Sequence, residues 1–237
     1  FSTGAVRGNA VIGLFDAAGN CIWSWHIWSV DYDPATMAQT YSSGAVFMDR
    51  NIGALTTDCT QPSSRGLYYQ WGRKDPMIYS SLLREAVWNE PCRGDVTYAP
   101  GYEYELCDPR EYDVPYDVMT IEWSIRHPTW YMYDATFEDW EPWESVSDWL
   151  YDSNSNLWGN RTTGSEIIMI TDKTIYDPCP PGWRVPDLED FKNISVASAS
   201  MPYYVMIYCN GSQTAKYPLG GFLNGSRYEN NGENACV

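Results

Sequence analysis

The sequence predicts an α+β fold in which a small antiparallel sheet and two helices carry long irregular loops. Short apolar and β-branched runs are bounded by Gly, Pro, Asn and Asp, as the strands of antiparallel sheets are. Two segments with helical spacing follow residues that can cap a helix. Two long segments, 89–117 and 129–165, are dense in turn-forming and aromatic residues and show no sustained period, which indicates loops.

The first predicted element is a β-hairpin near the amino terminus. Apolar runs over 9–15 and 21–30 flank a stretch with turn chemistry at 16–20. Alternation along the second run separates two sets of side chains, Trp23, Trp25 and Ile27 on one face, and Ser24, His26 and Trp28 on the other. Because both sets are largely apolar, we expect this strand to be covered on both sides.

Further strands and two helices complete the predicted core. The strands are expected at 45–48, 67–71, 166–171 and 203–209. Ser80 or Ser81 can cap a helix over 82–88, and Asp187 can cap a helix over 188–194. No repeat or low-complexity linker divides the chain. We therefore expect one structural unit, in which a hairpin region over 1–47 packs on a core over 48–237.

Composition excludes two classes of protein. The chain has 237 residues and a formal net charge of -16, so it lacks the basic footprint of an electrostatic nucleic-acid binder. No apolar run approaches the roughly 20 residues of a membrane-spanning helix, and we expect no membrane insertion. The 12 Trp and 19 Tyr far outnumber the 6 Phe, which favours aromatic rings at binding faces as well as in the core.

Seven cysteines, well separated along the chain, form no CxxC pair and have no histidine at ligand spacing. A structural zinc site is therefore not predicted. If six of them pair, the sequence does not fix the connectivity, and Cys92 with Cys107 is the first pair to test. The alternative is that several are buried thiols.

Four blocks of sequence resemble a known family. They read FMDRNIGA (47–54), GLYYQWGRKDP (66–76), SIRHPTW (124–130) and KTIYDPCPPGWRVP (173–186). In order and spacing they resemble the hallmark blocks of the Bacteroidetes major paralogous domain, the Fibrobacter-type domain of fimbrillin-like and fimbrial tip proteins. The resemblance implies a C-type-lectin-like fold and a place on the bacterial cell surface, attached to the outer membrane or a fimbrium. Relatives usually continue past Val237, so the resemblance also implies a truncated or divergent end.

Candidate catalytic and metal-binding residues do not form a recognisable pattern. His26 lies in a predicted strand and His127 precedes a proline, and no G-x-S-x-G nucleophile elbow occurs. The acidic residues between 103 and 117 offer oxygen ligands for calcium, but no EF-hand loop passes through them. We therefore predict neither an enzyme nor a bound metal or cofactor, with calcium as the minor alternative.

Two segments combine the side chains that favour ligand binding. The cluster over 138–144 places Trp140 and Trp143 among carboxylates, which suits a sugar ring. The segment over 223–234 is rich in Asn, Ser, Tyr and Gly, as antibody loops are. The candidate ligand-binding residues are Trp140, Trp143, Arg227, Tyr228, Asn230 and Asn231. The alternatives are an acidic loop pinned by two buried tryptophans and a chain end without fixed structure.

Together these observations predict a non-enzymatic adhesin or recognition module of fimbrial tip type. It would bind glycan or protein on a host or neighbouring cell. One alternative is a structural domain whose loops contact neighbouring fimbrial subunits without a soluble ligand. Another is a receptor-binding display protein, as used by phage and by diversity-generating elements.

Overall fold

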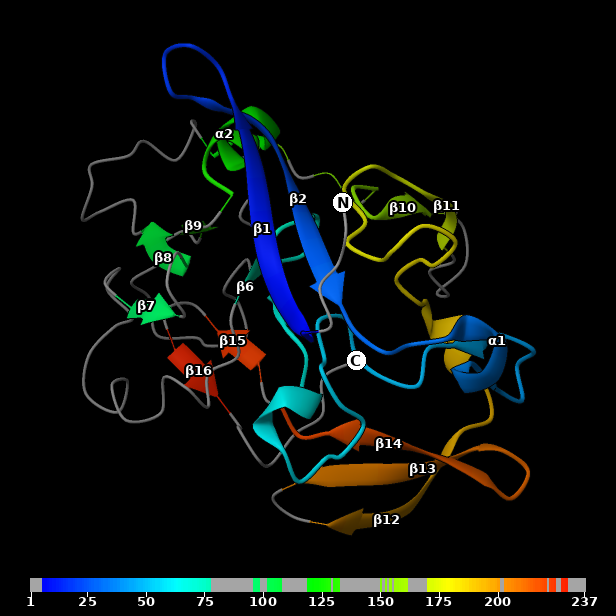
Figure 1. The fold of residues 1–237 in the computed structure, drawn as a ribbon. Coiled ribbons are helices and arrows are strands. Elements are labelled where there is room, and N and C mark those ends of the chain that lie inside the picture. Colours follow the sequence, from blue (N-terminus) through cyan, green and yellow to red (C-terminus); the bar gives the residue numbers. More distant parts are fainter. Residues whose placement is uncertain are drawn as a thin grey trace, which may run out of the picture.

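The computed structural model describes residues 6–77, 96–98, 102–107, 119–128, 130–132, 150, 152, 154, 156–161, 170–200, 203–220, 222–224 and 227–229. Within them, short antiparallel strands dominate and helices are few and short, which agrees with the predicted α+β class (Figure 1). The strands form several separate two- and three-stranded sheets, and one pair, β8 with β9, is parallel.

The described elements have the following bounds. The strands are β1 Gly8–Phe15, β2 Cys21–Ser29, β3 Gln39–Thr40, β4 Val46–Phe47, β5 Tyr68–Tyr69, β6 Pro76–Met77, β7 Val96–Tyr98, β8 Tyr102–Cys107, β9 Trp130–Met132, β10 Gly159–Arg161, β11 Ile170–Lys173, β12 Ser195–Ser200, β13 Tyr204–Asn210, β14 Gln213–Pro218, β15 Phe222–Asn224 and β16 Arg227–Glu229. The helices are α1 Pro34–Met37 and α2 Ile121–Arg126, with 3-10 turns η1 Pro62–Ser64 and η4 Leu188–Phe191.

The predicted amino-terminal hairpin is confirmed. β1 and β2 pair antiparallel in continuous register from Gly8 opposite Ser29 to Leu14 opposite Trp23, with one irregularity before Phe15. The turn between them is closed by Asp16, whose side chain accepts hydrogen bonds from the backbone N–H groups of Ala18 and Asn20, both at 2.8 Å. An aspartate at this position replaces the missing ladder bonds of a five-residue turn.

A second sheet, of order β12-β13-β14, closes a hydrophobic core at another part of the molecule. The strand predicted over 203–209 is confirmed as its central strand, β13. The two flanking strands were not predicted, because β12 consists of Ser, Ala and Val and β14 carries polar residues at most positions. The buried side chains of this core are Tyr41, Ile207, Cys209 and Ala215, with Phe47, Phe191, Ile194, Val205 and Tyr217 packed against them.

Other predicted elements are confirmed in part. β4, β5 and β11 overlap the predicted strands over 45–48, 67–71 and 166–171. Asp187 caps as predicted, with a capping box that it shares with Asp190, but the helix is a 3-10 turn that ends at Phe191. It is shorter than predicted because Lys192 already has an extended ψ of 141°, and Asn193 then takes a left-handed φ of 61° before β12. The helix predicted over 82–88 lies outside the described residues.

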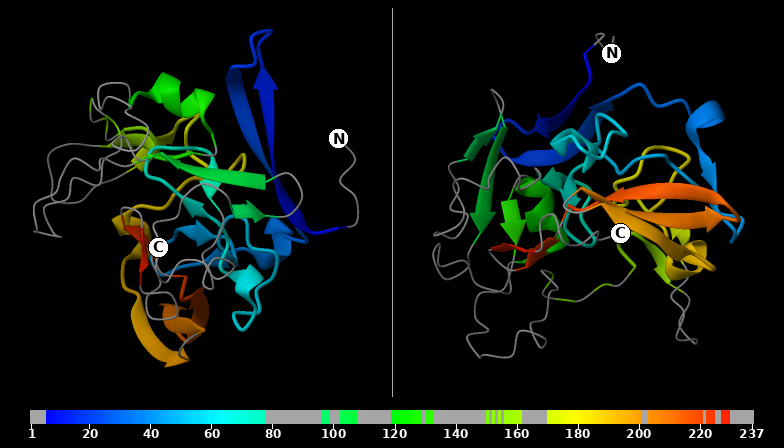
Figure 2. Two further views of the ribbon diagram at one scale, coloured as in Figure 1. Left: turned by 90° about the vertical axis from the view of Figure 1, so that its left-hand side faces the viewer. Right: turned by 90° about the horizontal axis from the view of Figure 1, so that it is seen from below.

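Helix α2, which the sequence did not predict, packs against β2 and against a second small core. Thr120 caps it by accepting from the backbone N–H of Trp123 at 3.2 Å. The core beneath consists of Met119, Leu150 and Leu157. In Figure 1 the hairpin (dark blue) with α2 beside its turn and the β12–β14 sheet (orange) lie at opposite ends, and they stay apart in both views of Figure 2.

The cysteines whose side chains the structure describes do not pair. Cys21, Cys59, Cys179 and Cys209 are free, and three of them are buried. Four free cysteines among seven leave no room for three disulfides, so the case in which six pair does not hold, and the alternative of buried thiols applies to Cys21, Cys59 and Cys209. The proposed partner Cys92, the side chain of Cys107 and Cys236 lie outside the described part of the chain.

Candidate functional site

The two faces of the β1–β2 hairpin differ in chemistry, and the face that carries the polar side chains Asn9, Ser24 and His26 is turned toward the protein. Cross-strand register sorts the side chains into two sets. The inner set comprises Asn9, Val11, Gly13, Ser24, His26 and Trp28. The outer set comprises Ala10, Ile12, Leu14, Trp23, Trp25 and Ile27. The usual arrangement of a half-buried antiparallel sheet is the reverse, with its apolar face on the core.

The inner face is anchored first by a buried ionic cluster. Ser24, 1% exposed, donates its hydroxyl to Oδ1 of Asp75 at 2.6 Å, and Asp75 is itself 4% exposed. Nζ of Lys74 donates to both oxygens of Asp75 at 2.9 Å and to the carbonyl of Ser24 at 3.0 Å. Burial lowers the pKa of Lys74, against the opposing effect of Asp75. Since every charge here is paired, the cluster fixes β2 on the protein and is costly to break.

His26 forms the second anchor, through a chain of hydrogen bonds. Nδ2 of Asn9 donates to the carbonyl of Gly53 at 2.8 Å, which fixes the orientation of the amide. Oδ1 of Asn9, which can only accept a hydrogen bond, lies 2.9 Å from Nε2 of His26. Nε2 therefore carries the proton, and Nδ1 accepts from the hydroxyl of Tyr69 at 2.8 Å. Burial lowers the pKa of His26 to about 4, with Asp75 opposing the shift, so the imidazole is neutral at pH 7.

The third anchor is the segment Gly53-Ala54-Leu55, whose carbonyls point toward the hairpin. Besides the bond from Asn9 to Gly53, the indole Nε1 of Trp28 donates to Ala54 at 3.1 Å and Arg7 donates to Leu55 at 3.1 Å. Gly53 has a φ of 82°, and a Cβ there would lie 2.6 Å from Leu67, so only glycine fits. The backbone of this segment is thereby held in a shape that offers three acceptors.

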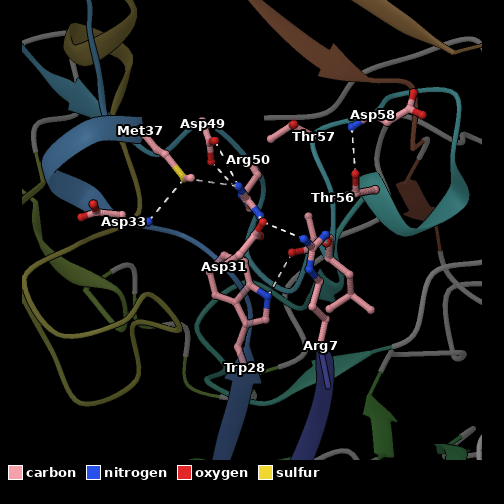
Figure 3. A network of polar contacts seen from close by, with 12 residues as sticks. Arg7, Trp28, Asp31, Asp33, Met37, Asp49, Arg50, Thr56, Thr57 and Asp58 are labelled. Carbon is pink, nitrogen blue, oxygen red and sulfur yellow. Dashed lines mark hydrogen bonds and ion pairs between the residues drawn. The ribbon is translucent and has the colours of Figure 1, made fainter. Parts of the chain in front are cut away.

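An ion-pair network covers the open end of the hairpin, where the chain enters β1 and leaves β2. Figure 3 shows Arg50 between Asp49, Asp31 and the sulfur of Met37, with Arg7 on the far side of Asp31. The side chain of Arg50 is buried and lies 2.7 Å from Asp49 and 3.0 Å from Asp31, while Arg7 lies 2.7 Å from Asp31 near the surface. The hydrogen bond from Arg50 is the main reason that the pKa of Asp31 is lowered.

The outer face of the hairpin is left exposed. Ile12 is 39% exposed, Leu14 50%, Trp25 47% and Ile27 36%. We call these four residues, with exposed Ala10, the hairpin face. Since a large apolar side chain covers about 150–250 Å², the face exposes on the order of 400 Å², a size at which surface patches are often functional. The expectation that this strand is covered on both sides is therefore wrong.

Trp23 belongs to the outer set but does not join the hairpin face. Its ring lies 6.2 Å from the ring of Tyr176, and the ammonium of Lys74 lies 4.5 Å from its centroid. The protein thus covers Trp23, next to the buried ionic cluster, while Leu14 opposite it stays exposed. The alternation of residues 23–28 in the sequence separates the side chains into two sets. It does not indicate which of the two sets is exposed.

The ligand-binding residues predicted from sequence lie mostly outside the described part of the chain. Trp140 and Trp143, with the whole cluster over 138–144, and Asn230 and Asn231 are in this group. Arg227 and Tyr228 lie on β16, which pairs with β15 in register, Tyr228 opposite Leu223 and Arg227 opposite Asn224. Of the segment 223–234, for which the alternative was a chain end without fixed structure, residues 223–224 and 227–229 are therefore paired in strands, and the remainder lies outside the described residues.

Ser24 and the two histidines are engaged in structural contacts. Ser24 and His26 are held in the inner face, and Nδ1 of His127 lies 2.9 Å from the carbonyl of Trp123. Desolvation raises the pKa of Cys21, Cys59 and Cys179, which keeps these thiols protonated. Across the described ranges, His, Cys, Asp and Glu side chains form no group of three that could hold a metal ion, and no helix is long and apolar enough to cross a membrane.

Comparisons with known proteins found no matching family model, no matching curated protein and no matching solved structure.

Proposed function

We propose that this protein is a non-enzymatic recognition module of a bacterial cell surface or fimbrial tip that binds another protein through the hairpin face. The observation that carries the proposal is the inverted hairpin, since apolar side chains that could have been buried are presented to solvent while polar ones are turned inward. Keeping an apolar face in water costs about 25 cal/mol per Å², which a partner surface recovers.

The chemistry of the face favours protein over glycan as the ligand. A sugar needs hydrogen-bond partners at its edge beside an aromatic ring, and the hairpin face carries one ring, Trp25, among aliphatic side chains. A flat aliphatic surface with a single large aromatic anchor is typical of the centre of a protein interface. Glycan binding through Trp140, Trp143 and Tyr228 is the alternative to this proposal.

The structural alternative, a domain that contacts neighbouring fimbrial subunits, is favoured by the same observation. Permanent interfaces between subunits are the most apolar class of interface. The alternative uses the same surface as the first proposal. It differs in the partner, which is a fimbrial subunit, and in the longer lifetime of the complex.

The experiment is binding of the purified protein to arrays of host-cell proteins, glycans and fimbrial subunits, with matched variants. Ile12→Ser and Trp25→Ser should abolish binding to protein targets, while Val196→Ser should not, because Val196 is equally apolar and 69% exposed but lies on β12. Binding to fimbrial subunits alone would support the assembly role. Glycan binding that is lost in Trp140→Ala or Tyr228→Ala and kept in Trp25→Ser would contradict the proposal.

A further inference from the structure

Among the residues that the structure describes, none pairs with the outer edge of β1. In the described part of the chain β1 pairs with β2 alone, and no hydrogen bond outside that ladder reaches the backbone of Gly8–Leu14. At the corresponding edge of β2, Lys74 donates to the carbonyl of Ser24. An open edge presents unpaired N–H and C=O groups to any extended chain that approaches.

β1 also lacks the devices that normally protect an edge. It is eight residues long, GNAVIGLF, without charge or proline, and its one register irregularity falls at the last step before Phe15. The edges of the β12–β14 sheet do carry such devices, since β14 contains Lys216 and ends at Pro218 and β12 shifts register between Val196 and Ser198. Both edges of the carboxyl-terminal sheet are thus guarded, whereas β1 is not.

We propose that β1 accepts an extended strand of a partner protein by strand addition, and that this strand alternates apolar with polar residues and carries basic residues at its ends. The inference rests on the proposed function and names the partner of the same surface. Alternate side chains of an added strand lie on the side of Ile12 and Leu14 and extend the hairpin face, as the pleat requires. The main-chain bonds then supply affinity and the side chains supply specificity.

Area and charge together define the partner. The hairpin face, on the order of 400 Å², is about half of what each partner contributes to a stable interface, so strand pairing must supply the remainder. The chain carries a net charge of -16, and Asp16 lies at the turn of the hairpin, where hydrogen bonds from Asn20 lower its pKa and keep it ionised. A basic strand is attracted to this surface, whereas a second copy of the chain is repelled.

The test uses backbone hydrogen–deuterium exchange of the purified protein with three synthetic peptides. The first alternates valine and threonine between lysines at both ends; the second replaces the lysines with glutamates; the third is the first with alternate backbone nitrogens methylated. The first peptide should slow exchange in β1 at least about tenfold and leave β14 unchanged. The glutamate peptide should bind much more weakly, and the methylated peptide should give no protection.

Several outcomes would overturn the inference. Equal protection by the methylated peptide would show that the backbone edge is not used, and equal binding of the glutamate peptide would remove the charge requirement. A dimer of the protein alone, with β1 already protected, would make a second copy the occupant. If Trp25→Ser abolishes binding on the protein arrays while no peptide protects β1, the proposed function stands and strand addition fails.

Discussion

The β1–β2 hairpin and the β12–β14 sheet are both small antiparallel sheets, yet they are held to the protein by opposite means. β13 turns Ile207 and Cys209 onto a core that includes Tyr41, as a half-buried sheet should. The hairpin turns Ser24 and His26 inward, onto hydrogen-bond and ion-pair partners, and leaves its apolar side chains outside. One sheet is therefore held by the hydrophobic effect, and the other by directional polar contacts.

The way in which each sheet is attached to the protein determines which of its faces can bind a partner. A sheet whose apolar face is used for folding cannot offer that face to a partner. The hairpin keeps its apolar face available because buried polar contacts on the other face attach it to the protein. Such contacts fix the geometry of the hairpin, but they are sensitive to changes in charge and pH.

Asp75→Ala should have the largest effect, because it leaves Lys74 and Ser24 buried without their partner. The expected loss in the free energy of unfolding is about 3–5 kcal/mol, measured by urea denaturation. Glu122→Ala is the control, since Glu122 pairs with Arg126 in an exposed pair on α2, and its loss should cost under about 0.5 kcal/mol. Equal effects of the two variants would mean that the ionic cluster does not anchor the hairpin.

The same substitution at two isoleucines compares the sheets directly. Ile207→Ala removes a buried side chain from the core under β13 and should cost about 2–5 kcal/mol. Ile12→Ala removes an exposed side chain from the hairpin face and should change the free energy of unfolding by no more than about 0.5 kcal/mol. Thermal or urea unfolding of the two variants measures both values, and a large loss for Ile12→Ala would show that the hairpin face is covered within the protein.

Acid should weaken the hairpin's attachment through His26, whose pKa falls from 6.5 to about 4 on folding. Above pH 6.5 both states are neutral and stability is full. Between pH 6.5 and 4 the unfolded chain binds a proton that the folded chain does not, so stability falls as pH falls. Below about pH 4 the folded protein also binds it, and the loss levels off at about 3 kcal/mol.

The measurement is the urea midpoint as a function of pH for the wild type and His26→Gln. The variant should lose the slope between pH 6.5 and 4, because glutamine does not titrate. Asp16, Asp31 and Asp58, whose pKa values lie below the ordinary 3.8, add to the loss of stability only below about pH 5, and they do so equally in the wild type and the variant. An unchanged slope in His26→Gln would refute the assignment.

Arg7→Ala should have the smallest effect of the four. Arg7 and Asp31 form an ion pair in which both side chains are about half exposed, and Asp31 keeps its second partner, Arg50. The expected cost is under about 1 kcal/mol, and it should shrink as salt is added. If Arg7→Ala lowered the free energy of unfolding as much as Asp75→Ala does, the hairpin would be attached mainly by the ion-pair network at its open end and not by its inner face.

Parts of the fold were predictable because their signals are local. The turn at Asp16, the alternation of β2 and the cap at Asp187 each follow from residues within a few positions of one another. β12 was not predictable, since a run of serine and alanine has no strand signal of its own and forms only against β13. α2 was missed for a similar reason, because it is short and packs against β2 and a core assembled from distant residues.

Local sequence is enough to predict that residues 8–29 form a hairpin with two sets of side chains, since a period of two follows from backbone geometry alone. Which of the two sets faces the protein depends on contacts with the rest of the fold. The partners that draw the polar set inward, the carboxylate of Asp75, the hydroxyl of Tyr69 and the carbonyl of Gly53, lie more than 40 residues away in sequence. Alternation defines two faces of the hairpin. The polar face is the buried one because folding brings hydrogen-bond and ion-pair partners to it.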